Sequence, residues 1–470
     1  MYHKLMALLA IFPLLIFVIW LLIDHKASIL KIALIVLGIV ISEALFIWKM
    51  PFLALGGQFW KGILIAFDIF MIVFGAILFW ELLKKYRVTQ SLAIYLNNIS
   101  GDIRVQVILL GWFLEAFLEG VAGFGTPAIV VGPMLLALGL SPLQSMTIAL
   151  LGNGVPVIFG AAGTPVRVLS GTGVDILLLG QRAALYNLAG IIVPMMIVWV
   201  ALAGDKNRKQ EFFDFLPMSI MAGILFWGAS LLVSFLGIEF PSILGSIISL
   251  VLFLGIFSIW DKGEKVNKNK ADLPLFRVIF PYVTLVSILI LFKILGKNVN
   301  PGVAFLITAV IISICYKGKI REWKNFIKSA FKSALSPFLL VAIMSFLVQV
   351  MNGSGMIVSL IGLFKNRWLP VMAMWIGTLG SFVTGSATVS NLMFGNLIKM
   401  VAESMGMEVI GAMAWLLVGG GVGNMIAIAD TVATKAVIGG KETLTEVLMK
   451  VLPYCMIYLC VASLLAMVLR

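Results

Sequence analysis

Apolar segments of about 20 residues recur along the whole chain, with short polar connections between them. That length suits an α-helix that crosses the hydrocarbon core of a bilayer. The pattern predicts spanning helices near residues 5–23, 29–49, 60–82, 103–118, 184–203, 217–236, 239–260, 276–295, 299–316, 333–351 and 449–469. Together with two interrupted segments, it predicts an all-α polytopic membrane protein with roughly 12 or more transmembrane helices.

The first interruption follows the apolar run Val107–Leu118 and reads Glu119-Gly-Val-Ala-Gly-Phe-Gly-Thr-Pro-Ala128. One carboxylate, three glycines and a proline in ten residues are incompatible with a simple spanning helix. Lipid offers no hydrogen bonds to broken backbone, so such backbone is tolerated at membrane depth only where it lines a cavity or is buried in protein. We therefore expect a substrate path along a broken zone near 119–165.

A second interruption keeps the spacing of the first. Phe117-Leu-Glu-Gly120 corresponds to Phe382-Val-Thr-Gly385, 265 residues later, and the same shift places Gly152–Pro165 on Leu417–Asp430. Chance similarity between glycine-rich membrane segments is the rival explanation. Paired interrupted segments in two halves of a chain indicate the binding site of a secondary transporter. We expect one membrane domain with two repeats, each containing a re-entrant or broken helix: a first half at 1–260, a polar connecting loop at 261–275, and a second half at 276–470 broken near 384–430.

Composition and charge support a membrane protein. Apolar residues make up 61% of the 470 residues, charged residues make up 12%, and the mean hydropathy is +1.12. A soluble domain carries about twice that share of charge. The net charge of +13 does not indicate nucleic-acid binding, because Lys and Arg cluster in short connections. Asp205–Lys209, Asp261–Lys270 and Lys317–Lys332 are separated by pairs of spans, so they are predicted to share the cytoplasmic side.

The chain offers little for an enzyme or a metal site. Its three cysteines lie in apolar segments, without the spacing of a metal or redox site, so neither a metal nor a cofactor is expected. An enzyme acting on membrane lipids would need a cluster of His, Asp or Arg at a membrane face, and the two histidines are both near the amino terminus. A channel is disfavoured because the broken zones show no ring of charges.

Two carboxyl groups precede the first break. Glu115 and Glu119 lie four residues apart, on one face of a helix. Buried at that spacing, each disfavours the charged form of the other, and a membrane carboxyl of this kind can load and release a proton near neutral pH. Glu119, beside the break, is the better candidate for proton coupling. The alternative is an ion pair with Arg104 or Arg167, and Arg167 itself either attracts an anion or marks the cytoplasmic rim.

The breaks also carry neutral hydrogen-bonding groups. In the first zone Thr126 and Asn153 are polar, and glycines such as Gly123 and Gly125 let helix amino termini approach a ligand. The second zone supplies hydroxyl and amide side chains within a few residues, namely Ser386, Thr388, Ser390 and Asn391. Such groups suit a carboxylate, although small and hydroxyl residues also allow close helix packing. Asp430 either coordinates a cation together with Asn424, pairs with Lys435, or lies in solvent.

Several of these motifs resemble those of the L-lactate permease family. Phe117-Leu-Glu-Gly-Val-Ala-Gly-Phe-Gly-Thr-Pro127 is similar to the family signature, and Gly139-Leu-Ser-Pro-Leu143 and Asn153–Pro165 also match. Thr384-Gly-Ser-Ala-Thr-Val-Ser-Asn-Leu-Met-Phe394 resembles the second-half element. The resemblance implies a multi-pass protein of a prokaryotic plasma membrane, with a fold of two repeats and re-entrant hairpins. It also implies proton-coupled transport of small 2-hydroxy monocarboxylates such as lactate and glycolate.

The chain departs from the family pattern in two elements. Ala387 stands where the second element normally has Asp. The family's Gly-Lys-Met-Ile-Ser-Pro-Gln run is here Gly423-Asn-Met-Ile-Ala-Ile-Ala429, so Asn424 replaces a lysine and the Ser-Pro-Gln is lost. One carboxyl and one ammonium group are thus absent together, which leaves the net charge of the site unchanged. The resemblance therefore supports the fold more firmly than the substrate.

From these observations we expect a secondary active transporter, not an enzyme, in which the two breaks meet near the bilayer midplane. Gly120–Ala128 and Ser386–Asn391 would hold the carboxylate of a small organic anion, Asn153 would orient its 2-hydroxyl, and Glu119 would carry the coupled proton. The alternative is a sodium-coupled organic anion carrier of the wider ion-transporter group, with Asp430 and Asn424 as oxygen ligands. The sequence leaves the oligomeric state open.

Overall fold

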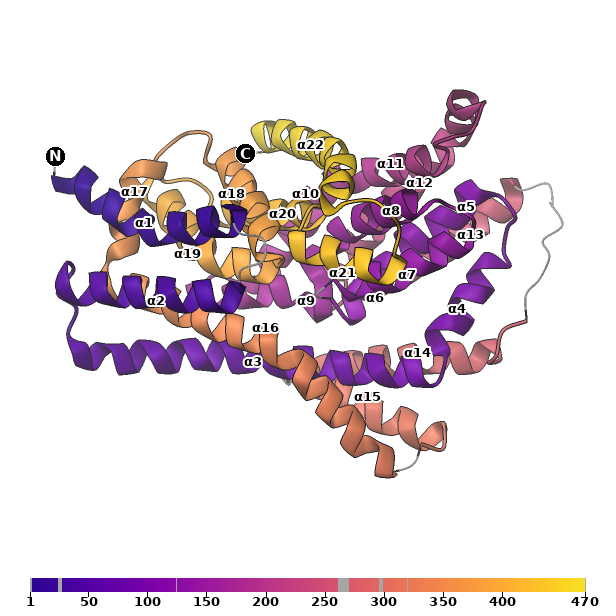
Figure 1. Ribbon diagram of the computed structural model, residues 1–470, viewed down its shortest axis with the longest axis horizontal. Coiled ribbons are helices and arrows are strands. Elements are labelled where there is room, and N and C mark those ends of the chain that lie inside the picture. The colour runs from indigo at the N-terminus through magenta and orange to yellow at the C-terminus, as the bar shows by residue number, and fades with distance from the viewer. Residues whose placement is uncertain are drawn as a thin grey trace.

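The computed structural model describes residues 2–23, 28–123, 125–260, 270–295, 299–318 and 320–469. Throughout these residues the regular structure is helical, as the hydrophobic pattern predicts. Most of the predicted connecting loop 261–275 lies outside the described residues. Figure 1 shows an elongated bundle in which the long helices α3 and α16 cross each other.

The first half contains an amino-terminal hairpin, a long helix and the first broken zone. Its helices are α1 (Tyr2–Ile23), α2 (Ile29–Phe46), α3 (Phe52–Lys85), α4 (Val88–Asn97), α5 (Ile103–Ile108), the π-helix η1 (Leu109–Leu114), α6 (Glu115–Val121), α7 (Thr126–Ala137), α8 (Pro142–Gly154), η2 (Pro156–Phe159), α9 (Gly160–Arg167), η3 (Val168–Thr172), α10 (Ile176–Tyr186), η4 (Asn187–Ile192), α11 (Val193–Ala201), α12 (Arg208–Ser234) and α13 (Ile243–Trp260).

The second half contains the second broken zone. Its helices are α14 (Leu275–Ile294), α15 (Pro301–Cys315), α16 (Ile320–Ser354), α17 (Met356–Phe364), α18 (Leu369–Thr384), α19 (Ala387–Ser404), α20 (Val409–Asn424), α21 (Ile428–Ile438) and α22 (Leu444–Val468). In each half a helix breaks, restarts, turns back and breaks again. Structural equivalence of the two halves stays a prediction.

Aromatic packing joins the two long helices where they cross. The ring of Phe70 on α3 lies 5.9 Å from that of Phe331 and 5.0 Å from that of Phe338, both on α16. Both contacts are edge-on, a geometry that adds about 0.5–1.5 kcal/mol per pair to the burial of the rings. These contacts hold the two helices against each other.

Ion pairs gather several charged connections at one end of the molecule. Lys85 pairs with Glu322 at 2.9 Å, and Arg87 pairs with Asp272 at 3.0 Å. These contacts join the end of α3 to the segments before α14 and at the start of α16. The end of α3 thus lies beside the basic connection 317–332 and beside the residues that directly follow 261–270.

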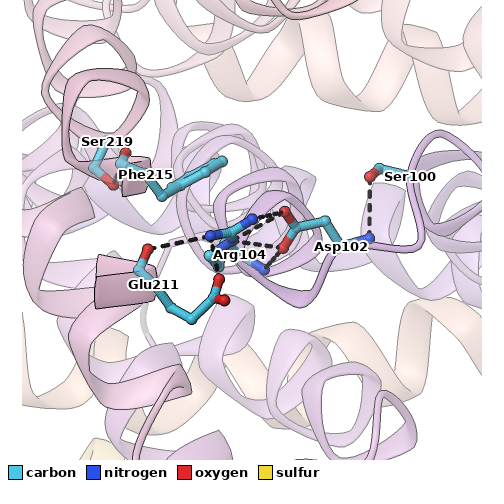
Figure 2. A network of polar contacts seen from close by, with 6 residues as sticks. All are labelled: Ser100, Asp102, Arg104, Glu211, Phe215 and Ser219. Atoms are coloured by element: carbon cyan, nitrogen blue, oxygen red, sulfur yellow. Dashed lines mark hydrogen bonds and ion pairs between the residues drawn. The ribbon is translucent and has the colours of Figure 1, made fainter. Parts of the chain in front are cut away.

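A second polar network ties α5 to the start of α12. Figure 2 shows Arg104 between the carboxylates of Asp102 and Glu211, with N to O distances of 2.6 and 2.5 Å. The guanidinium also lies over the ring of Phe215, 5.2 Å from its centre. Asp102 caps α5 by accepting a hydrogen bond from the Arg104 amide. Because Arg104 is engaged here, it does not pair with Glu119.

Fewer helices reach spanning length than the hydrophobic pattern suggests. Among the described residues, eight helices are long and apolar enough to cross a membrane, or up to ten when each bent pair counts as one span. The expected 12 or more spans are therefore not confirmed. Four apolar helices are shorter, within Leu5–Leu21, Thr126–Ala137, Ile243–Ile259 and Pro301–Cys315. Part of the difference lies at helix ends: the predicted segments 239–260 and 299–316 form the shorter helices α13 and α15, because their first residues lie in turns or loops.

Candidate binding cavity between the two broken zones

The two broken zones meet at one cavity. In this structure it is small, about 20 Å³, and it is lined by residues of both halves: Glu119, Gly123, Gly125, Val157, Gly160, Ala161, Thr164, Pro165, Gly385, Ser386, Ala387, Thr388 and Asn424. The helix breaks create this space, because residues that leave helical geometry no longer fill the area between neighbouring helices. Segments predicted to face each other thus line the same cavity.

The amino terminus of α7 lies at the cavity beside a carboxylate of the chain itself. Gly125 precedes α7 with φ +71°, and a Cβ at this position would clash with Oδ1 of Asp430. The other oxygen of Asp430 accepts a hydrogen bond of 2.8 Å from Nδ2 of Asn424. Asp430 is buried, with 6% of its surface exposed, and it forms no ion pair with Lys435 or with any other described residue. The positive end of the α7 dipole favours a negative charge at this place.

Glu119 brings an unpaired carboxyl group to the cavity wall. Its side chain is 3% exposed, and Oε2 has no hydrogen-bond partner among the described residues. Its other oxygen, Oε1, lies so close to Gly160 that a Cβ there would clash with it. Glu115, one turn earlier, is fully buried, and neither of its oxygens has a described partner.

The proposed cationic partners of Glu119 are engaged elsewhere. Arg104 pairs with Asp102 and Glu211, and Arg167 pairs with Glu239 at 2.5 Å. Glu115, Glu119 and Asp430 are close enough for electrostatic repulsion if more than one of them is charged. The lining includes no Lys, Arg or His among the residues that the structure describes.

Hydroxyl groups of the second zone divide between the cavity and the helix ends. Ser386 lines the cavity and caps α19, where its Oγ accepts a hydrogen bond of 3.3 Å from the Val389 amide. Thr388 also lines the cavity. Ser390 lies behind the wall and donates to the Gly377 carbonyl at 3.0 Å, and Asn391 donates through Nδ2 to the Pro165 carbonyl at 3.0 Å. Asn391 thereby ties the second zone to the first.

The structure thus brings together about half of the site residues that the sequence suggests. Glu119, Gly123, Gly125, Ser386, Thr388 and Asn424 line the cavity. Outside its lining lie Glu115, Thr126, Asn153, Ser390, Asn391 and Asp430. Asn153 is fully buried on α8, and both polar atoms of its amide lack a partner among the described residues.

One part of the wall has an unusual backbone that sequence reasoning did not single out. Ala161, Ala162 and Gly163 have positive φ angles of 42°, 52° and 79°. Two consecutive alanines in this region are strained, since their Cβ atoms crowd the backbone. Thr164 closes the turn by donating to the Ala161 carbonyl at 2.7 Å. The run Gly160-Ala-Ala-Gly-Thr-Pro165 signals a turn, but it does not reveal which residues adopt the left-handed geometry.

An apolar helical bundle with a cavity between broken helices is typical of multi-pass membrane transport proteins. A sequence profile described as L-lactate permease matches residues 6–296 and 276–470. The chain belongs to the L-lactate permease family, as its motifs indicate, and it is a multi-pass protein of the plasma membrane.

Relatives that align over more than two thirds of their length support this assignment. The chain is 26% identical to a putative L-lactate permease of Haemophilus influenzae, over 84% of this chain and 85% of the relative. It is 29% identical to an L-lactate permease of Streptococcus iniae, over 67% and 73% of the two chains. It is also 26% identical to a glycolate permease of Escherichia coli, over 93% and 91%.

A solved structure has a similar fold. The YdaH transporter of Alcanivorax borkumensis matches 88% of this chain and 86% of its own chain, with a TM-score of 0.50 and 13% sequence identity. At that identity the likeness concerns the arrangement of the helices alone.

Proposed function

We propose that this protein carries small 2-hydroxy monocarboxylates, such as lactate or glycolate, together with a proton that is bound by Glu119. The observation that carries the proposal is an unpaired carboxyl group in the wall of a cavity whose described lining has no cationic side chain. The substrate class follows from the names of the relatives, which include L-lactate permeases and a glycolate permease.

Electrostatics explains why proton and anion would travel together. Two like charges 4 Å apart repel by about 4 kcal/mol at an effective dielectric constant of 20. A charged Glu119 would therefore oppose the binding of a carboxylate in the same cavity, whereas a protonated Glu119 would not. Binding of the anion thus favours binding of the proton, which is the coupling that symport requires.

The membrane potential makes this coupling useful. A monoanion that enters a negative-inside cell moves against about 2.3 kcal/mol per 100 mV. A proton carried with it cancels the charge, so the anion gradient and the pH gradient alone would determine uptake.

Neutral groups in the cavity provide the contacts for the substrate carboxylate. The hydroxyl groups of Ser386 and Thr388 line the cavity, as does the backbone at the amino-terminal end of α19. These groups satisfy a carboxylate by hydrogen bonds without adding charge. Asn153 lies outside the lining, so it would reach the 2-hydroxyl only after a movement of α8.

The test uses purified protein in proteoliposomes, with labelled lactate or glycolate and with proton and sodium gradients imposed separately. We expect a pH gradient to drive accumulation and a sodium gradient at constant pH to have no effect. Accumulation that follows sodium would favour the sodium-coupled alternative. Absence of uptake of either acid under both gradients would refute the substrate class.

The Glu119→Gln variant tests the residue itself. It should keep exchange of labelled for unlabelled acid across the membrane while losing accumulation driven by the pH gradient. Glu43→Gln is a matched control, because Glu43 is also a buried carboxyl (8% exposed) with an unpaired Oε2, but it lies on α2 and not in the cavity lining. Unchanged proton-driven accumulation in Glu119→Gln would remove this residue from the mechanism.

A further inference from the structure

A second, larger cavity lies behind the strained segment of the first. Its volume is about 360 Å³, and its lining includes Arg167, Leu177, Ile238, Glu239, Phe292 and Lys293. The segment 160–167 separates the two cavities, since Thr164 and Pro165 line the central one and Arg167 lines the second. Only a short stretch of backbone therefore lies between them along the chain.

Contacts with the connection between α12 and α13 hold the segment 160–167 in place between the two cavities. Gly163 packs so closely on the Ile238 carbonyl that a Cβ there would clash with it. The ion pair between Arg167 and Glu239, at 2.5 Å, fastens the two sides, and both side chains are less than 20% exposed. The strained backbone at Ala161 and Ala162 lies in this same segment. Strain of this kind is typical of places where a structure switches between two arrangements.

The second cavity has a positive balance of charge. Arg167 and Lys293 contribute two cations and Glu239 contributes one carboxylate. The Nε atom of Arg167 is buried and has no hydrogen-bond partner among the described residues. Lys293 is exposed and forms no ion pair within the described part of the chain. A guanidinium with an unused donor and a free ammonium are the groups that bind a carboxylate.

The position of this cavity indicates which side it serves. Lys293 lies in the last turn of α14 and Glu239 follows α12, whereas Asp272 and Glu211 lie at the opposite ends of these helices. Asp272 and Glu211 belong to the end where the basic connections gather, which the positive-inside rule makes cytoplasmic. The second cavity would accordingly open to the outside of the cell.

We infer that this cavity is an external vestibule in which Arg167 and Lys293 hold the carboxylate of the incoming substrate before it passes the segment 160–167. The inference rests on the proposed function for the identity of the anion. When the substrate carboxylate replaces Glu239 on Arg167, the ion pair that fastens the segment opens. Binding in the vestibule thus frees the segment 160–167 to move, which opens the way to the central cavity.

A thiol probe tests the charge of the vestibule without any transport assay. In a background with Cys315, Cys455 and Cys460 replaced, Leu177→Cys is reacted in proteoliposomes with a sulfonate-bearing and a trimethylammonium-bearing methanethiosulfonate. Each labelling rate is first divided by the rate of the same reagent with a small thiol in solution. After this correction, the anionic reagent should react about tenfold faster than the cationic one, because a cationic pocket concentrates anions. Lys293→Gln should reduce this preference, and lactate should slow the labelling.

Lys365→Gln is the matched control, since Lys365 is also exposed and lies outside the vestibule lining. It should leave the preference unchanged. Equal rates for both reagents in the Leu177→Cys protein would overturn the vestibule. So would an equal fall of the anion preference in Lys293→Gln and Lys365→Gln. This outcome is independent of the substrate: a protein that shows the anion preference but transports neither acid would refute the proposed function and keep the vestibule.

Transport kinetics test the exchange of partners on Arg167. Arg167→Gln should raise the KM for uptake from outside by about tenfold, because a charge-assisted hydrogen bond is lost. Glu239→Gln should lower the KM, because Arg167 is then free for the substrate. If Glu239→Gln raises the KM as much as Arg167→Gln does, the pair is a structural contact and the inference fails. If Arg167→Gln does not fold, Lys293→Gln tests the same prediction of a raised KM, because Lys293 is exposed and its replacement should not disturb folding.

Discussion

The two broken zones have similar orders of helices but treat their polar groups differently. In the first zone and the turn before it, Glu115, Glu119 and Asn153 keep buried atoms without hydrogen-bond partners among the described residues. In the second zone, Ser390 and Asn424 each donate a hydrogen bond within the protein, to Gly377 and Asp430, although Oδ1 of Asn391 and Nε1 of Trp415 are buried without a described partner. The first zone therefore differs in its carboxyl groups: it holds buried carboxyl oxygens without partners, whereas the Asp430 carboxylate of the second zone accepts a hydrogen bond.

Energetics explains why this difference points to function. A buried polar group without a partner costs about 1–3 kcal/mol. Three such side chains in one zone are a large cost for a fold whose net stability is about 5–15 kcal/mol. Unsatisfied groups of this kind persist where a ligand, a proton or water completes them. We therefore expect variants in the first zone to affect transport most and variants in the second zone to affect stability most.

The largest effect should come from Gly125→Ala, where the two zones touch. The added methyl group would clash with Oδ1 of Asp430 and would also occupy a backbone with φ +71°. Displacement of α7 or Asp430 by even 1 Å should lower the initial rate of uptake by about a hundredfold. The rate is measured per mole of reconstituted protein, with the melting temperature in detergent recorded alongside.

Gly139→Ala separates backbone strain from contact. Gly139 also has a positive φ, of 91°, but nothing lies within 4 Å of its missing Cβ. Its variant should lose some stability and keep most of its transport. Equal loss of transport in both variants would mean that strain, and not the contact with Asp430, explains the effect.

A smaller effect is expected from Glu115→Gln. Glu115 lies one turn behind Glu119 and outside the cavity lining, so it would influence the proton on Glu119 by charge and not by contact with substrate. Residues that act on a site from this position change coupling by about 0.5–2 kcal/mol, or about tenfold in rate. The measurement is the initial rate of proton-driven uptake together with the final accumulation ratio. Loss of accumulation as complete as in Glu119→Gln would make Glu115 an equal member of the proton site.

The sequence predicted the breaks because their cause is local. Glycine and proline end helices wherever they gather, so the zones near 119–165 and 384–430 could be recognised from residue types alone. The faces of the helices could not be assigned in the same way. Whether Thr388 or Ser390 faces the cavity depends on where α19 begins, and a shift of one residue rotates the whole face by about 100°.

Two further features depended on the tertiary structure. Alanine does not favour positive φ, so the left-handed pair at Ala161 and Ala162 arises from packing and not from local preference. The pairing of Arg167 with Glu239 joins residues 72 positions apart, and no pattern in the sequence selects one partner among several carboxylates. Contacts of this kind become visible only when the helices are placed together.

Paired hydroxyl variants sharpen the comparison within the second zone. Ser386→Ala should raise the KM by about three- to tenfold, which corresponds to the loss of one hydrogen bond to the substrate. Ser390→Ala removes the bond to the Gly377 carbonyl, so it should lower the free energy of unfolding by about 1 kcal/mol and leave the KM unchanged. Uptake kinetics and thermal unfolding in detergent measure the two quantities. A change in KM for Ser390→Ala as large as for Ser386→Ala would place both hydroxyls at the substrate.

The smallest effect, and the one most specific to the first zone, is expected from Asn153→Leu. Both polar atoms of this buried amide lack partners among the described residues, so an apolar side chain of similar size removes a desolvation cost. The variant should be as stable as the original protein or more stable by about 1 kcal/mol, while exchange of labelled acid slows if Asn153 meets the 2-hydroxyl when α8 moves. Comparing lactate with propionate, which has no 2-hydroxyl, isolates that contact, because only the rate for lactate should fall. A loss of stability would instead show that hidden water or a neighbouring group satisfies Asn153 in the resting protein, and the first zone would then be as self-contained as the second.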